Sequence, residues 1–88
     1  MRISIITAVS ALGLIVSVEP ALAASCYDLW YERNSIYDAN GYCFKTRLGR
    51  QTFDNSDCYT DNVRLSRSEQ RRVNEIQDEE DSRGCHVN

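Results

Sequence analysis

Few side chains in this 88-residue chain could take part in catalysis. A nucleophilic triad needs a serine or cysteine, a histidine and an acid held in one constellation. The one histidine, His86, lies beside Cys85 at the end of the sequence, with no candidate nucleophile at hand. The four cysteines are an even number in a small chain, which is typical of disulfides rather than free thiolates. Nucleophilic catalysis is therefore not expected.

Carboxylates are the remaining candidates for acid–base chemistry. Two acidic side chains flanking a glycosidic bond can hydrolyse it, and Asp28, Glu32 and Asp38 are the candidates. The four-residue spacing of Asp28 and Glu32 places them on one face of a helix. Acids near the start of a helix, however, ordinarily stabilise its dipole. We expect no enzymatic activity, and a minimal envelope hydrolase that uses these carboxylates is the second alternative.

Metal binding is the other chemistry that cysteines support. Structural zinc sites use closely spaced pairs such as C-x₂-C, and no such pair occurs among the four cysteines. The acidic run at 78–81 lacks the spaced ligands and the glycine of a calcium loop. We expect neither a metal nor another cofactor. The net charge of −3 also argues against nucleic-acid binding.

A binding surface is better supported, because all eight aromatic residues fall between Tyr27 and Tyr59. Tyrosine combines an apolar ring with a polar tip and suits partly exposed surfaces. We expect Tyr31, Tyr42 and Tyr59 to be partly exposed. The candidate binding residues are Trp30, Tyr31, Arg33, Asn34, Tyr37, Asn40, Tyr42 and Tyr59. They would stack on sugar rings or receive a loop of a protein partner.

Two helices are needed to position these residues. Ser25 with Asp28 resembles a capping box, and apolar residues then recur at helical spacing up to Asn40-Gly41, which predicts a helix over 26–39. Gly41 is expected in the left-handed conformation that ends this helix. The pattern Ser66-x-x-Glu69 predicts a second helix over 67–82, ended by Gly84.

The predicted fold is mainly α, with two antiparallel helices joined by an irregular loop that contains a short helical turn near 47–53. Four cysteines allow three pairings. Antiparallel packing brings Cys26 beside Cys85 and leaves Cys43 to pair with Cys58. The second helix carries arginines first and acids last, against the helix dipole. We expect it to dock only through Leu65, Val73, Ile76 and the Cys85 tether, and Arg33 to bind carbonyls or carboxylates of the loop.

The first 23 residues have the layout of a secretory signal peptide. A basic Arg2 precedes an apolar run over 3–18, and Pro20 and Ala21-Leu22-Ala23 predict cleavage after Ala23. The apolar run is shorter than the ~20 residues that span a bilayer, which disfavours a membrane anchor. Lipidation of Cys26 at a loose lipobox is a further alternative, and only in that case is membrane association expected. We expect a periplasmic or secreted domain, 24–88, acting as a monomer.

The segment 29–45 resembles the signature of the YARHG domain, a bacterial extracytoplasmic module named after a Tyr-Ala-Arg-His-Gly motif. The matching residues are Leu29, Trp30, Tyr31, Arg33, Asn34, Ile36, Tyr37, Gly41, Tyr42 and Phe44, followed by Cys58-Tyr59 and by Leu65, Ser66, Glu69 and Asn74. The histidine of the motif is replaced by Asn40, which does not titrate, so no acid–base role carries over. The resemblance implies an exported domain without an assigned activity.

These observations favour a non-enzymatic, envelope-associated binding module that contacts peptidoglycan, another glycan or an envelope protein through an aromatic and polar face. A secreted inhibitor that enters the cleft of an envelope hydrolase is the first alternative, because small disulfide-bonded domains suit that role.

Overall fold

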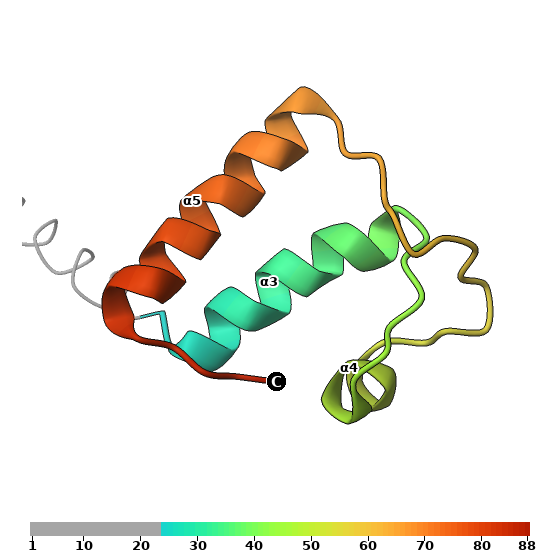
Figure 1. Cartoon of the computed structure of the whole chain (residues 1–88), viewed down its shortest axis with the longest axis horizontal. Coiled ribbons are helices and arrows are strands. Elements are labelled where there is room, and N and C mark those ends of the chain that lie inside the picture. Colours follow the sequence, from blue (N-terminus) through green and yellow to red (C-terminus); the bar gives the residue numbers. More distant parts are fainter. Residues whose placement is uncertain (1–23) are drawn as a thin grey trace, which may run out of the picture.

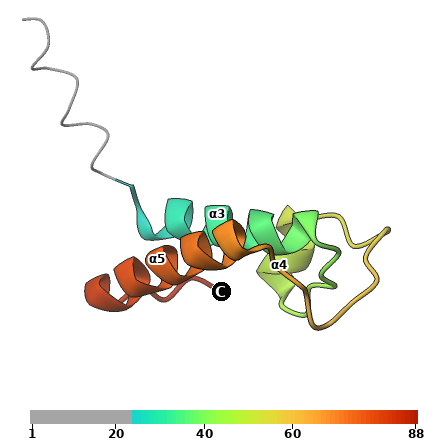
Figure 2. The same ribbon diagram turned by 90° about the horizontal axis from the view of Figure 1, so that it is seen from above.

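The structure, a computed structural model, describes residues 24–88. These residues form three helices, α3 (Cys26–Ala39), α4 (Arg47–Thr52) and α5 (Arg67–Arg83), and contain no strand beyond an isolated bridge between Tyr42 and Thr60. Helices α3 and α5 run antiparallel side by side (Figures 1 and 2), and α4 lies on the side of α3 away from α5 (Figure 1). The mainly α prediction is confirmed. The predicted signal peptide, 1–23, lies outside the described residues.

Helix α3 begins and ends as its sequence predicts. The Ser25 hydroxyl accepts a hydrogen bond from the Asp28 N–H at 3.0 Å, and the Asp28 carboxylate accepts one from the Ser25 N–H at 3.1 Å. Both halves of the capping box are therefore formed, so aspartate replaces the longer glutamate without loss of either bond. At the other end Gly41 has a φ of 85°, the left-handed conformation that glycine adopts without steric cost.

Helix α5, like α3, begins at a capping box and is followed by a left-handed glycine. The Ser66 hydroxyl accepts from the Glu69 N–H at 3.1 Å, and the Glu69 carboxylate accepts from the Ser66 N–H at 2.9 Å. Gly84 follows the helix with a φ of 65°. The helix extends to Arg83, one residue further than predicted.

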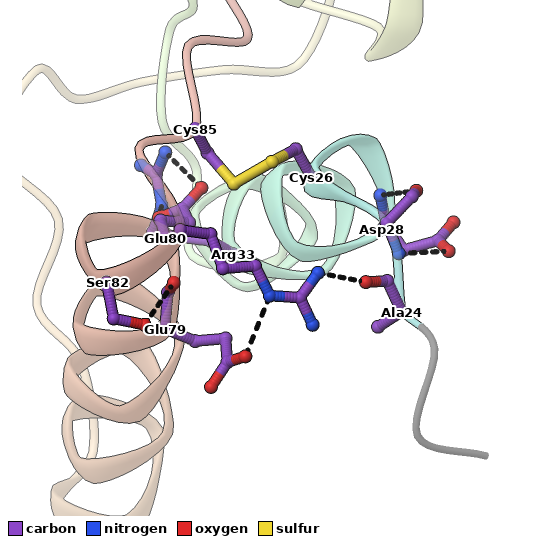
Figure 3. Close-up of a disulfide and its surroundings, with 10 residues drawn as sticks. Ala24, Cys26, Asp28, Arg33, Glu79, Glu80, Ser82 and Cys85 are labelled. Atoms are coloured by element: carbon purple, nitrogen blue, oxygen red, sulfur yellow. Dashed lines mark hydrogen bonds and ion pairs between the residues drawn. A yellow bond between two sulfur atoms is a disulfide. The ribbon is translucent and has the colours of Figure 1, made fainter. Parts of the chain in front are cut away.

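Two disulfides close the chain, and both have the predicted partners. Cys26 at the start of α3 is bonded to Cys85 just after α5, with their Cα atoms 5.5 Å apart (Figure 3). Cys43 is bonded to Cys58 across the loop, with a Cα–Cα distance of 5.0 Å. In this pairing the Cys26 sulfur is not available for lipidation. None of the helices in the described part of the chain is long and apolar enough to span a membrane.

The apolar interior is divided into two small groups. Leu29 of α3 and Val73 and Ile76 of α5 are buried where the two helices pack. Trp30, Phe44 and Phe53 form a separate aromatic cluster, with Tyr37, Tyr42, Leu48 and Val87 packed against it. We call α3 and α5 the helix hairpin and residues 40–66, which include α4, the loop lobe. Each has its own disulfide, and Trp30 brings the hairpin into contact with the lobe.

Ion pairs across the hairpin correct two of the expectations. Arg33 donates to both carboxylate oxygens of Glu80, at 2.8 and 3.1 Å, near the Cys26–Cys85 disulfide (Figure 3). Arg72 donates to both oxygens of Glu32, at 2.6 and 2.7 Å. The partner of Arg33 is thus on α5 and not in the loop. The expectation that α5 docks only through its apolar stripe and tether is also wrong, because its charges pair with those of α3.

Candidate functional site

Four of the predicted binding residues line a hollow of about 370 Å³ between α3 and the end of the loop lobe. We call it the seam hollow. Its lining residues are Arg33, Asn34, Tyr37, Tyr42, Asp61, Asn62 and Val63. The first three come from adjoining turns of α3, and the turn at Gly41 returns Tyr42 toward the same side.

Two tyrosine rings form the aromatic wall of the seam hollow. The centroids of Tyr37 and Tyr42 are 6.0 Å apart, with their planes inclined by 58°. Both side chains are half-buried, and Tyr42 also packs edge-on against Phe44, at a centroid distance of 4.9 Å. A backbone hydrogen bond from the Tyr42 N–H to the Tyr37 carbonyl, at 3.2 Å, fixes the two residues relative to each other. The wall is therefore anchored on the aromatic core.

Asn34 provides a buried polar group in the same hollow. Its residue surface is only 8% exposed, and its side-chain Nδ2 donates to the Trp30 carbonyl at 2.8 Å. Among residues 24–88, nothing donates a hydrogen bond to its Oδ1. A buried acceptor without a donor is costly and uncommon in native proteins. Asn34, which lines the hollow, therefore has an unused acceptor.

Both charged residues of the seam hollow already have partners. Burial alone would lower the pKa of Arg33, but the hydrogen bonds and charge of Glu80, helped by neighbouring Tyr37, raise it above its ordinary value. Asp61 accepts a hydrogen bond from the Lys45 ammonium at 2.8 Å. The charges around the hollow are thus neutralised in pairs, and the site suits an uncharged group.

A second hollow, of about 330 Å³, adjoins the first because Asn62 lines both. It is also lined by Asn40 and Tyr59 from the predicted set, and by Thr60 and Arg64. The Tyr59 side chain is 77% exposed, yet its ring lies against Gly41, where a Cβ atom would collide with it. One face of the Tyr59 ring is therefore supported by the backbone while the other faces solvent.

Trp30 and Tyr31 line neither the seam hollow nor the second hollow. Trp30 is 5% exposed, in the core between the two regions. Tyr31 is 46% exposed and stacks on Phe53, with centroids 5.3 Å apart. Tyr27, which the sequence analysis did not select, is 45% exposed beside Tyr31. The four-residue spacing of Tyr27 and Tyr31 on one helix was the signal that could have identified this second aromatic surface.

Two of the candidate carboxylates of α3, Asp28 and Glu32, are each bound by a different structural partner. Asp28 is in the capping box, and Glu32 is bound by Arg72, whose hydrogen bonds lower the pKa of Glu32. Asp38 lines a third hollow, of about 220 Å³, with Asp54 and Asp57. Backbone and side-chain hydrogen bonds from Ser56 lower the pKa of Asp54. Within residues 24–88, no group of three or more histidine, cysteine or acidic side chains could hold a metal ion.

The comparisons with known proteins identify a family. The model of the family described as the YARHG domain matches residues 16–81, which include all of α3, α4 and the loop lobe and most of α5. No curated protein and no solved structure matches the chain.

Proposed function

The chain belongs to the YARHG domain family, and from this premise we propose that it is a non-enzymatic binding module of the bacterial cell envelope. Membership indicates a small extracellular domain and assigns it no activity. The proposed ligand is an envelope glycan such as peptidoglycan, bound by a single copy of the chain. The proposed binding residues are the four predicted ones in the seam hollow, Arg33, Asn34, Tyr37 and Tyr42, extended by Asn40 and Tyr59 in the adjoining hollow.

The two disulfides fit an extracellular or periplasmic compartment, because disulfides persist where the surroundings are oxidising. We propose that residues 1–23 direct export and are cleaved after Ala23. The intact mass of the exported protein measures this directly. A chain that starts at Ala24 supports the proposal, and one that keeps the first 23 residues or carries a lipid contradicts it.

The observation that carries the glycan proposal is the composition of the seam hollow. A pyranose ring offers an apolar face, which packs on aromatic rings, and a rim of uncharged hydrogen-bonding groups. The hollow offers two tyrosine rings, an unused amide oxygen on Asn34, and charges that are already paired. Its volume of about 370 Å³ is within the range of small-ligand sites.

Retention on purified peptidoglycan tests this proposal. We expect wild-type protein to be retained at low salt and the Tyr42→Leu variant to bind about tenfold more weakly, because leucine keeps much of the packing on Phe44 and removes the ring face. Tyr31→Leu is the matched control, since Tyr31 is an exposed tyrosine on another surface of α3. Absence of wild-type retention would overturn the glycan proposal.

The inhibitor alternative rests on the other aromatic surface. Tyr27 and Tyr31 are both nearly half exposed, with ring centroids 6.1 Å apart, and tyrosine is enriched in protein–protein contacts. This role requires co-purification with one envelope enzyme and a dose-dependent loss of that enzyme's activity. Replacing both tyrosines with serine should remove the inhibition while leaving peptidoglycan retention unchanged.

The hydrolase alternative would need Asp28 or Glu32 to leave its structural partner. A glycoside hydrolase requires an acid with a raised pKa, whereas Arg72 lowers that of Glu32. We propose that these carboxylates stabilise α3 and its packing on α5. Release of soluble glycan fragments by the wild type, abolished in Asp28→Asn or Glu32→Gln, would contradict the proposed non-enzymatic role.

A further inference from the structure

We infer that the seam hollow is a subsite for the acetamido group of an N-acetylated amino sugar. This inference rests on the proposed glycan-binding function and specifies which sugars the hollow accepts. It follows from three features of the hollow: an unused acceptor, an adjacent donor and the absence of unpaired charge.

The acceptor is the Oδ1 of Asn34. Only 8% of the residue's surface is exposed, and no donor within the described part of the chain reaches this oxygen. Because Asn34 lines the hollow, a ligand that enters can satisfy this oxygen by bringing an N–H or O–H group to it. A ligand without a donor at this point would seal the oxygen from water and bind weakly.

The donor is the Nη1 of Arg33. Glu80 is bound through Nε and Nη2, so the Nη1 hydrogens are not used in that ion pair. An arginine has no acceptor, and the ligand must therefore present an oxygen to it. Arg33 and Asn34 are consecutive residues that line the same hollow. An acceptor on one residue and a donor on the next are the complement of a group with one N–H donor and one carbonyl acceptor, which is a secondary amide.

Charge and shape restrict the ligand further. The Arg33 charge is balanced by Glu80 and the Asp61 charge by Lys45, so the hollow offers no unpaired charge to an ionic group. The rings of Tyr37 and Tyr42, inclined to each other by 58°, provide apolar faces against which a methyl group or a sugar ring packs. An acetamido group combines the methyl, the N–H and the carbonyl without a charge.

Peptide bonds are the other source of secondary amides in the envelope. An extended peptide is commonly bound by adding a strand to an open sheet edge. Residues 24–88 form no strand, and the main-chain groups nearest the hollow are already used: the Cys43 N–H donates to the Thr60 carbonyl, and the Thr60 N–H to the Gly41 carbonyl. The absence of such an edge favours the amide of an amino sugar over that of a peptide.

Isothermal titration with three uncharged probes tests the inference on the wild-type protein. We expect tri-N-acetylchitotriose to bind at least about tenfold more tightly than cellotriose, which has a hydroxyl in place of each acetamido group. A blocked alanine tripeptide should bind more weakly than the chitotriose. Equal binding of both trisaccharides would overturn the inference and leave glycan binding intact. Tighter binding of the tripeptide would also overturn it, and absence of peptidoglycan retention would overturn the underlying function.

The variant Asn34→Leu assigns the preference to the proposed oxygen. Leucine has the same branching and the same number of side-chain heavy atoms but no acceptor, so we expect the ratio of affinities for chitotriose and cellotriose to fall to about threefold or less. Asn74→Leu, an exposed asparagine on α5, is the matched control and should keep the wild-type ratio. Circular dichroism verifies that both variants retain the helices. A folded Asn34→Leu protein with an unchanged ratio would contradict the assignment.

Discussion

The helix hairpin and the loop lobe are stabilised by different interactions, although each contains one disulfide. In the hairpin, Leu29, Val73 and Ile76 are the buried apolar residues, and two bidentate ion pairs cross between the helices. In the loop lobe, Phe44 and Phe53 stack at a centroid distance of 4.8 Å, and Asn55 bonds both the N–H and the carbonyl of Phe44. The hairpin thus depends on charge and the lobe on aromatic packing.

The difference explains where the candidate site lies. The seam hollow is formed where α3 of the hairpin meets the 61–63 segment of the loop lobe. The hairpin contributes Arg33 and its balancing Glu80, and the lobe contributes Tyr42 and its support by Phe44. Neither region alone would provide a neutral hollow with a polar rim and an aromatic wall.

Removal of the disulfides should give the largest effect. They close segments with sequence separations of 59 and 15 residues, for which the chain-entropy model gives about 4 and about 3 kcal/mol. We therefore expect the double variant Cys26→Ser/Cys85→Ser to lose more free energy of unfolding than Cys43→Ser/Cys58→Ser. Denaturant titration followed by helical circular dichroism measures both. A larger loss for the second pair would show that the lobe, and not the hairpin, limits stability.

Breaking the partly buried ion pair should follow in size. The side chains of Arg33 and Glu80 are 21% and 11% exposed, and those of Arg72 and Glu32 are both 46% exposed. Glu80→Gln should cost about 2 kcal/mol, between the values for exposed and fully buried pairs, because it leaves the Arg33 charge uncompensated. Glu32→Gln, the matched control, should cost less than about 1 kcal/mol. Equal losses in denaturant titration would contradict the distinction.

The two left-handed glycines allow a matched test of the Tyr59 platform. Gly84→Ala adds only conformational strain, of about 1 kcal/mol, because nothing lies near the position of its Cβ. Gly41→Ala carries a similar strain and also displaces the Tyr59 ring, so its cost should be greater than that of Gly84→Ala. Thermal unfolding measures the two losses. Tyr59 proton chemical shifts should change in Gly41→Ala alone, and unchanged shifts would refute the contact.

Acid should weaken the hairpin by a smaller amount. Hydrogen bonds from Arg72 hold the pKa of Glu32 below its ordinary value of 4.5, so in the unfolded chain this carboxylate takes up its proton at a higher pH. The stabilisation from Glu32 is therefore complete well above pH 4.5 and is lost as the pH falls through the folded value. Melting temperatures recorded from pH 7 downward should fall less in Glu32→Gln than in Glu75→Gln, whose carboxylate bonds Arg72 within α5. Identical pH profiles would exclude this contribution.

Local sequence patterns predicted the helices because their ends are set by local interactions. The capping boxes at Ser25 and Ser66 and the glycines at 41 and 84 involve only residues within a few positions of each other. The disulfide pairing followed once the helices were taken as antiparallel. The Arg33–Glu80 and Glu32–Arg72 pairs were not predicted, since they depend on the rotation of each helix about its axis, which the weak apolar stripe of α5 does not specify.

The candidate site could be predicted only in part for a related reason. Arg33, Asn34 and Tyr37 lie on one helix, and their proximity follows from its periodicity. The opposite wall, Asp61, Asn62 and Val63, belongs to an irregular loop whose position is fixed by the Cys43–Cys58 disulfide and the Tyr42–Thr60 bridge. The sequence of this loop indicated turns, and it did not indicate which residues of α3 the loop would lie against.

Nuclear magnetic resonance of ¹⁵N-labelled residues 24–88, titrated with tri-N-acetylchitotriose, tests the glycan site most directly. We predict saturable shifts of the Asn34 side-chain amide, the Arg33 Nε–H and the backbone amides of Tyr42 and residues 61–63, with no change at Tyr27 and Tyr31. Shifts confined to Tyr27 and Tyr31, or none at saturating sugar, would contradict a glycan site between the hairpin and the lobe.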